Sequence, residues 1–148
     1  MTSLTPAEMG LAAKKRGNVE FAKNTREGYE AALVEYEEAI KHDPTQHVFH
    51  ANAAAAHLEI AKKQWEQPRK VETFARGLLA ATKCTEINAQ WVKGFVRRAA
   101  AEFELVAARA AWRKQVADDE ARGDDGTGFA AEPGPDAALM PCIEAASY

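Results

Sequence analysis

The sequence predicts an all-α protein built from stacked helix–turn–helix repeats. Alanine is the most frequent of the 148 residues and the strongest helix former, whereas β-branched residues are few. The chain also repeats itself at a fixed offset, which is typical of repeat architectures. No apolar run approaches the ~20 residues that span a bilayer, and the N-terminus carries no hydrophobic signal segment. We therefore expect one helical domain whose core is made of closely packed small side chains.

Residues 28–44 and 73–89 are expected to be the second helices of two successive helix pairs. In each segment an aromatic residue is followed by small residues three and ten positions later, and a helix places these positions on one face. Small residues on that face let a neighbouring helix approach closely. The positions are Tyr29, Ala32 and Ala39 in the first segment and Phe74, Gly77 and Cys84 in the second.

The first helices of the pairs are expected in residues 11–21, 47–60 and 91–105, which share an alanine-rich helical pattern. The order of a first and a second helix is therefore predicted to occur three times. The third pair is ambiguous, because no Gly or Pro marks a turn after Leu105. We prefer a second helix that ends near Arg122, and one long uninterrupted helix is the alternative.

The repeat domain is predicted to occupy residues 9–122. Residues 1–8 are expected to form a flexible N-terminal lead. A helix that starts at Thr5-Pro6 is the alternative, since Pro is favoured at the first helical position.

Residues 123–148 form a separate acidic tail in this prediction. They are rich in Gly and Pro, and we expect their first half to be a disordered linker. The net charge of the chain is −3, but no Lys or Arg follows Arg122, so the tail carries −5 and residues 1–122 carry +2. The end of the tail, residues 137–146, has enough apolar side chains to dock on another surface, namely Leu139, Met140 and Ile143.

The charge balance and the cysteine content exclude several classes of protein. A body at +2 lacks the basic stripe of a nucleic-acid-binding protein. Two cysteines without a secretory signal indicate reduced thiols and a cytoplasmic location. His47 and His50 lie three apart, but no cluster of carboxylates or cysteines completes a metal site around them. No arrangement of nucleophile, base and acid marks a catalytic site, so we expect no enzyme, no cofactor, and no nucleic-acid or membrane partner.

Basic and amide side chains recur on the expected first helices. Lys14 and Asn18 are four residues apart, as are Lys93 and Arg97, so each pair lies on one helical face. Asn52 occupies the first helix between them. Because the first helices of such a stack line its concave surface, we expect all five side chains to converge there. Their ammonium, guanidinium and amide donors suit a ligand with clustered carboxylates, such as a chain end beside an Asp side chain.

The motifs that hold these residues resemble the first helices of carboxylate-clamp tetratricopeptide domains. They are KKRGNVEF, HANAAAA after a DPTQ turn, and WVKGFVRRAAA, and the resemblance covers about residues 10–105. It implies a right-handed superhelical solenoid of three repeats. It also implies a small cochaperone or adaptor that binds the C-terminal Glu-Glu-Val-Asp tail of the 70-kDa and 90-kDa heat-shock chaperones. The residues that it assigns to the peptide carboxylates are Lys14, Asn18, Asn52, Lys93 and Arg97.

Three apolar residues follow on the same helical faces, one or more turns further along. They form either an apolar wall for the Val of the ligand or ordinary packing between repeats, and they are Phe21, Ala55 and Leu58. The rival to the whole interpretation is a structural tetratricopeptide scaffold that binds an internal peptide or a helix of another protein. In both interpretations the tail could contact a further protein.

The spacing of the repeats predicts an insertion. Tyr29 and Phe74 are 45 residues apart, whereas a tetratricopeptide unit takes about 34 residues. The surplus falls at about residues 60–72, in the turn between the two helices of the second pair. We expect it to form an elongated helix with Trp65 packed on a neighbouring helix, and an additional contact with a partner is the alternative.

Overall fold

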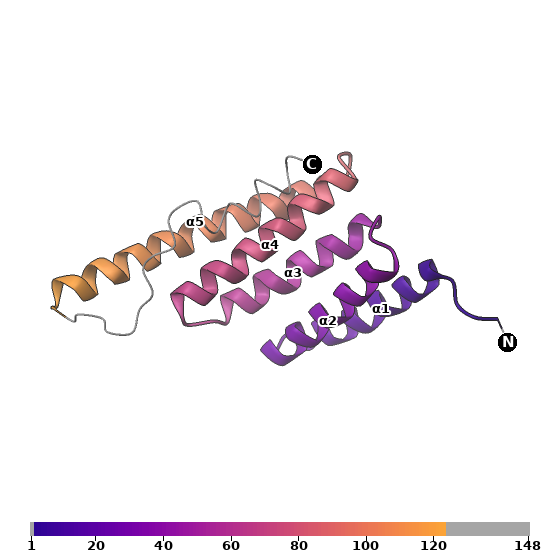
Figure 1. Ribbon diagram of the computed structural model, residues 1–148, viewed down its shortest axis with the longest axis horizontal. Coiled ribbons are helices and arrows are strands. Elements are labelled where there is room, and N and C mark those ends of the chain that lie inside the picture. Colours follow the sequence, from indigo (N-terminus) through magenta and orange to yellow (C-terminus); the bar gives the residue numbers. More distant parts are fainter. Residues whose placement is uncertain (1, 124–148) are drawn as a thin grey trace.

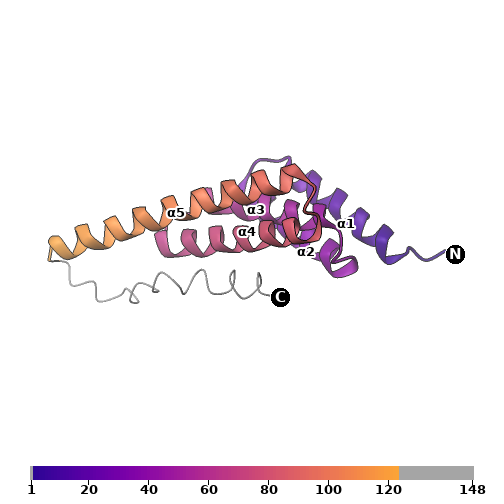
Figure 2. The ribbon, with the colours of Figure 1, turned by 90° about the horizontal axis from the view of Figure 1, so that it is seen from above.

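The computed structural model describes residues 2–123, which contain five α-helices and no strand (Figure 1). Each helix packs on the next one along the chain, and α3 also contacts α5. Figure 2 shows the stack from above, with α4 and α5 side by side. The prediction of an all-α stack of helical hairpins is confirmed. The helices are α1 (Pro6–Phe21), α2 (Arg26–His42), α3 (His47–Lys62), α4 (Gln67–Ile87) and α5 (Val92–Ala121).

The start of the first helix, α1, is defined by a capping motif. Helix α1 starts at Pro6, so the expected flexible lead over residues 1–8 is too long. The side chain of Thr5 accepts a hydrogen bond from the backbone N–H of Glu8, and the carboxylate of Glu8 accepts one from the backbone N–H of Thr5 at 2.7 Å. This reciprocal capping box fixes the start of α1. The predicted linker and the apolar segment 137–146 lie outside the described residues.

The positions of the sequence repeat lie in the core. Tyr29 and Phe74 are buried, and so are the small residues that were predicted to face a neighbouring helix. Gly17 shows how closely α1 and α2 approach, because a Cβ atom at this position would lie 2.5 Å from the ring of Tyr36. The packing of neighbouring helices through small residues is therefore confirmed.

The third helix pair is absent from residues 2–123. Helix α5 runs for 30 residues without a turn, so the preferred prediction of a separate second helix is wrong and the alternative of one long helix is correct. No Gly or Pro interrupts α5 after Gly94. Despite the length of α5, none of the helices in the described range is apolar enough over a sufficient stretch to cross a lipid bilayer.

The insertion near residues 60–72 and the uninterrupted course of α5 are structurally related, because the helix that the insertion lengthens packs on α5. The insertion lengthens α4 to 21 residues. The early turns of α4 supply Val71 and Ala75, which belong to the same core cluster as Ala108 and Trp112 from the second half of α5. The lengthened α4 therefore supports α5 from Ala101 to Trp112, which removes the need for a second helix to cover α5 from that side.

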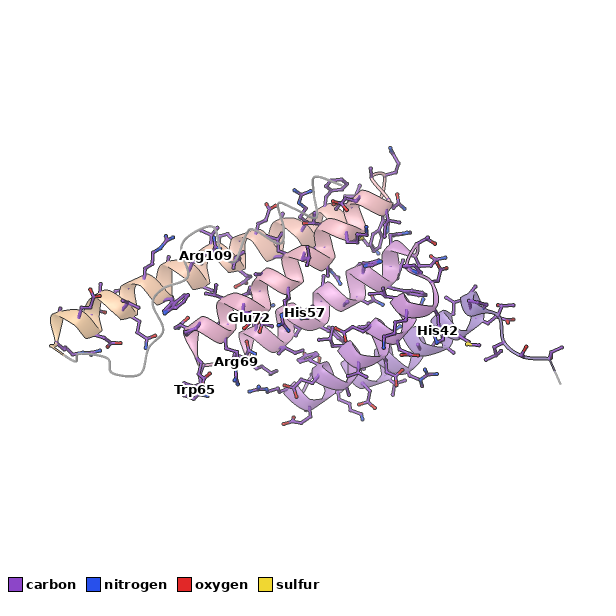
Figure 3. All side chains as sticks on the ribbon, in the orientation of Figure 1. His42, His57, Trp65, Arg69, Glu72 and Arg109 are labelled. Carbon is purple, nitrogen blue, oxygen red and sulfur yellow. The ribbon has the colours of Figure 1, made fainter. Side chains whose placement is uncertain are left out.

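Trp65 lies in the turn between α3 and α4. The expected elongation of a helix at the insertion is observed, but the expected packing of Trp65 is wrong, because its side chain is 81% exposed. It projects away from the helices beside Arg69 (Figure 3). The backbone after Lys62 turns before α4 begins at Gln67, and this turn directs the indole into solvent.

Candidate peptide-binding groove

The five predicted binding residues lie on three helices of the stack. Lys14 and Asn18 lie on α1, Asn52 on α3, and Lys93 and Arg97 on α5. These are the first, third and fifth helices, as the repeat pattern requires. Lys14 and Asn52 are half-buried, and Lys93 is exposed.

Arg97 links α5 to α3. Its guanidinium Nη1 donates a hydrogen bond to the backbone carbonyl of Ala51 at 2.9 Å, and Ala51 directly precedes Asn52. A guanidinium has five N–H donors, so this bond orients the group and leaves further donors for a ligand. The contact brings the predicted cation of α5 next to the predicted amide of α3.

Tyr36 on α2 contacts the predicted residue Asn18 on α1. Its hydroxyl donates a hydrogen bond to Asn18 Oδ1 at 2.8 Å, and its side chain is almost completely buried. Burial raises the pKa of the Tyr36 hydroxyl, and the positive charge of Arg97 partly opposes that rise. Since Asn18 Oδ1 already accepts from Tyr36, the Nδ2 group of Asn18 remains as the donor for a ligand.

The sequence interpretation missed Tyr36. The only signal for its role was a buried aromatic residue with a polar tip, seven positions after Tyr29 on the same helical face. Which acceptor its hydroxyl would find depends on how α1 packs on α2. That packing is a tertiary feature which the helical period does not contain.

The cations of the predicted site have no carboxylate partner within residues 2–123. Most Lys and Arg residues of the chain form an ion pair with a nearby Asp or Glu, and Arg98 pairs with Glu102 at 3.2 Å next to the site. By contrast, no carboxylate within residues 2–123 lies within ion-pair distance of Lys14, Lys93 or Arg97. Their charge is therefore available to an anionic ligand.

The three apolar residues have different surroundings. Leu58 is buried in the core cluster that α3, α4 and α5 share, so its assignment to an apolar wall is wrong and it serves packing between the repeats. Phe21 is half-buried and meets the ring of Tyr29 edge-on, with 4.9 Å between the ring centroids. Ala55 is half-buried on α3. Only Phe21 and Ala55 retain surface for a ligand side chain.

Two of the histidines contact the turns that precede α3 and α5. His50 Nε2 lies 2.9 Å from the carbonyl oxygen of Pro44, and burial lowers the pKa of His50. His47 meets the ring of Trp91 edge-on at 4.8 Å. Within the described part of the chain, no group of three His, Cys, Asp or Glu side chains is arranged to hold a metal ion.

An open hollow of about 450 Å³ lies between α2, α3 and α4, apart from the five predicted binding residues. His57 lines it beside Arg76, and burial together with the charge of Arg76 lowers the pKa of His57 to about 4. Figure 3 shows His57 on α3 facing the neighbouring α4. Its charged lining residues are Glu37, Glu86, Arg76 and Lys83, which are two acids and two cations. The hollow has no excess of donors for a carboxylate ligand.

Comparison with known proteins shows similarity to parts of larger proteins. No family model matches the chain, and no solved structure matches it significantly. The chain is 30% identical over 114 residues to the heat shock protein sti1 homolog of Schizosaccharomyces pombe, which covers 75% of the chain and 17% of that protein. It is 30% identical over 92 residues to an Hsp70-Hsp90 organising protein of Plasmodium falciparum, covering 62% of the chain and 31% of that protein.

An enzyme is also among the similar proteins. The chain is 31% identical over 85 residues to human serine/threonine-protein phosphatase 5, covering 57% of the chain and 15% of the phosphatase. The chain thus resembles one part of each of these three proteins and spans between 15% and 31% of their lengths.

Proposed function

We propose that this chain is a carboxylate-clamp tetratricopeptide module that binds the acidic C-terminal Glu-Glu-Val-Asp peptide of heat-shock chaperones. It acts as a small cochaperone or adaptor in the cytoplasm and not as an enzyme. The names of the similar proteins support a chaperone partner, because they describe a heat shock protein and an organiser of Hsp70 and Hsp90. The phosphatase supports only the binding module, since the match covers 15% of it.

One observation carries the proposal. Tyr36 of α2 donates a hydrogen bond to Asn18 of α1, and Arg97 of α5 donates one to the backbone of α3 beside Asn52. These two contacts support a common site for donors from α1, α3 and α5, and no carboxylate in residues 2–123 pairs with Lys14, Lys93 or Arg97. A solvated helix face would not require this arrangement.

The chemistry of the ligand matches these donors. A terminal carboxylate and the adjacent Asp side chain offer four oxygen acceptors to Lys14, Asn18, Asn52, Lys93 and Arg97. Each charge-assisted hydrogen bond contributes about 1.5–3 kcal/mol. Two or three such bonds, reduced by the entropy of ordering a peptide, give an expected Kd of about 1–100 μM.

A titration with two peptides tests this function. A peptide ending in Glu-Glu-Val-Asp should bind in the micromolar range, and the same peptide with an amidated C-terminus should bind at least tenfold more weakly, a difference of ~1.4 kcal/mol. Calorimetry at fixed salt measures both. Equal affinities would favour the rival interpretation, in which the chain is a scaffold for an internal peptide or a helix.

A further inference from the structure

Helix α5 carries a second apolar stripe on the side that faces away from the stack. Its buried stripe includes Leu105 and Trp112 and packs on α4. Phe103 lies two residues before Leu105, and two residues of an α-helix correspond to a rotation of about 200° about the helix axis. The side chain of Phe103 therefore points to the side opposite that of Leu105. We call this opposite stripe the outer face of α5. Its residues are Val92, Val96, Ala99, Phe103, Val106, Ala107 and Ala110.

The outer face of α5 is solvent-exposed within the described structure. Val92, Val96, Phe103 and Val106 are each between 63% and 73% exposed. All seven residues of the outer face are apolar. Six of them, from Val92 to Ala110, are spaced alternately by four and three residues, which is the heptad spacing of a helix face that packs along another segment. A helix that is apolar on two opposite sides is adapted to packing on both. A second helix of the third pair would cover this face in a complete repeat, and residues 2–123 contain none.

The charges beside the outer face favour an acidic occupant. Between Val92 and Lys114, α5 carries six cations and two acids, a net charge of +4. Among them Lys93 and Arg97 belong to the predicted clamp, Arg98 pairs with Glu102 and Lys114 pairs with Asp118, and none of the six lies on the outer face before Lys114. Figure 3 shows one of them, Arg109, on α5. A second copy of this chain would bring two segments of charge +4 together, which is unfavourable.

The acidic tail of this chain has the complementary chemistry. Residues 124–148 contain five acids and no cation, and they include a short apolar run. The tail also starts where α5 ends, so it reaches the outer face without a second molecule. Phe103 is 18 residues before Ala121, a distance of about 27 Å along the helix. The 14 residues 123–136 span up to about 45 Å when extended, which is more than enough.

We propose that residues 137–146 bind the outer face of α5 in the same molecule and take the place of the missing helix. Leu139, Met140 and Ile143 cover the exposed Phe103 and its apolar neighbours, and the acids of the tail lie beside the cations of α5. Tethering makes this contact effective, because a covalent connection of this length supplies a local concentration of about millimolar. The proposal is independent of the peptide-binding function.

Disulfide cross-linking to Cys142 tests this contact in the full chain. The other cysteine, Cys84, is fully buried and is replaced by Ala in all variants. A single new cysteine is then introduced on the outer face at Ala99, Ala107 or Ala110, so that the test does not depend on the register of the segment. The matched control is Val34→Cys on α2, which is 65% exposed and lies on a different helix. Mild oxidation at low protein concentration is followed by mass spectrometry.

We expect at least one outer-face variant to form an intramolecular disulfide at least tenfold faster than the control. Adding Phe103→Asp to that variant should remove the advantage, because the charge disrupts the apolar stripe while an exposed position tolerates it. Rates equal to that of the control would overturn the proposal. Disulfide-linked dimers as the main product would also overturn it and would identify a second copy as the occupant. An undiminished rate with Phe103→Asp would show that the apolar stripe is not used.

Discussion

Asn18 and Arg97 reach their positions through hydrogen bonds inside the protein before any ligand binds. The Asn18 amide is oriented by the hydroxyl of Tyr36, and the Arg97 guanidinium is oriented by the carbonyl of Ala51. Such preorganisation lowers the entropy that a peptide must lose on binding. The residues that hold the donors should therefore affect affinity almost as directly as the donors themselves.

Replacing Tyr36 with Phe should weaken peptide binding by about threefold to tenfold. The change removes the donor to Asn18 Oδ1 and lets the amide rotate, at an expected cost of ~0.7–1.4 kcal/mol in binding free energy. Tyr29→Phe is the matched control, because the Tyr29 hydroxyl bonds to Asn24 Oδ1 at 3.1 Å, outside the predicted site. Calorimetric titration of both variants checks the prediction. The same loss in both variants would rule out a specific role for Tyr36.

Replacing His57 with Gln should make stability less sensitive to acid. In the folded chain the pKa of His57 is lowered to about 4, whereas an unfolded His titrates at about 6.5. Between these values the unfolded state binds a proton that the folded state does not, so the free energy of unfolding falls as the pH falls. From pH 7 to pH 4.5 this effect amounts to about 2–3 kcal/mol. Urea unfolding at pH 7 and pH 4.5 measures how much the free energy of unfolding falls on acidification. This fall should be smaller by about 2–3 kcal/mol in the variant than in the unmodified chain. An equal fall in both proteins would contradict the lowered pKa of His57.

At the scale of single residues, the sequence predicted which side chains share one face of a helix. It did not predict contacts that depend on how one helix packs on another. Lys93 and Arg97 could be identified because a spacing of four defines a common face. Tyr36 could not, because its acceptor is on α1. Trp65 was expected to pack because large apolar residues usually do, but the direction of its side chain is set by the turn after α3.

At the scale of the elements, the defining feature is the match between a lengthened α4 and an uninterrupted α5. The helical period predicted where each element lies. The sequence also showed the surplus near residues 60–72 and the missing turn after Leu105. It did not show that these two features compensate each other, because the core cluster that joins them includes Val71 and Trp112, which lie 41 positions apart in the chain.

Replacing Trp112 with Ala should destabilise the fold by ~3–4 kcal/mol. Trp112 is buried against α4, and the smaller side chain would leave a cavity between α4 and α5. Trp65→Ala is the matched control, with an expected change within ~0.5 kcal/mol because its side chain is exposed. Chemical denaturation measures both. Equal effects of the two substitutions would mean that the second half of α5 does not pack on α4.

At the scale of the whole molecule, the stack separates two surfaces. The predicted clamp uses α1, α3 and the first turns of α5, and the outer face of α5 lies beside it on a different side of the same helix. The sequence alone predicted the acidic tail and the positive body. It could not predict that an apolar stripe of α5 would be exposed within residues 2–123, because that follows from the uninterrupted course of α5 in this range.

Deleting residues 124–148 should leave peptide affinity within about threefold, or ~0.7 kcal/mol. The tail supplies none of the five predicted binding residues, and its proposed position on the outer face leaves the clamp accessible. Titration of the truncated chain with the Glu-Glu-Val-Asp peptide checks this. Much tighter binding after truncation would mean that the acidic tail occupies the clamp instead, and a large loss would mean that the tail completes the binding site.

The most direct test of the clamp is to replace two adjacent arginines separately. Arg97 faces the predicted site and has no carboxylate partner in the described residues, whereas its neighbour Arg98 pairs with Glu102. Arg97→Ala should cost ~2–4 kcal/mol of peptide-binding free energy, a loss of more than tenfold, because a ligand carboxylate would be left without its partner. Arg98→Ala should bind the Glu-Glu-Val-Asp peptide like the unmodified chain. If Arg97→Ala also binds the peptide with unchanged affinity, the groove does not use its cations and the clamp account is wrong.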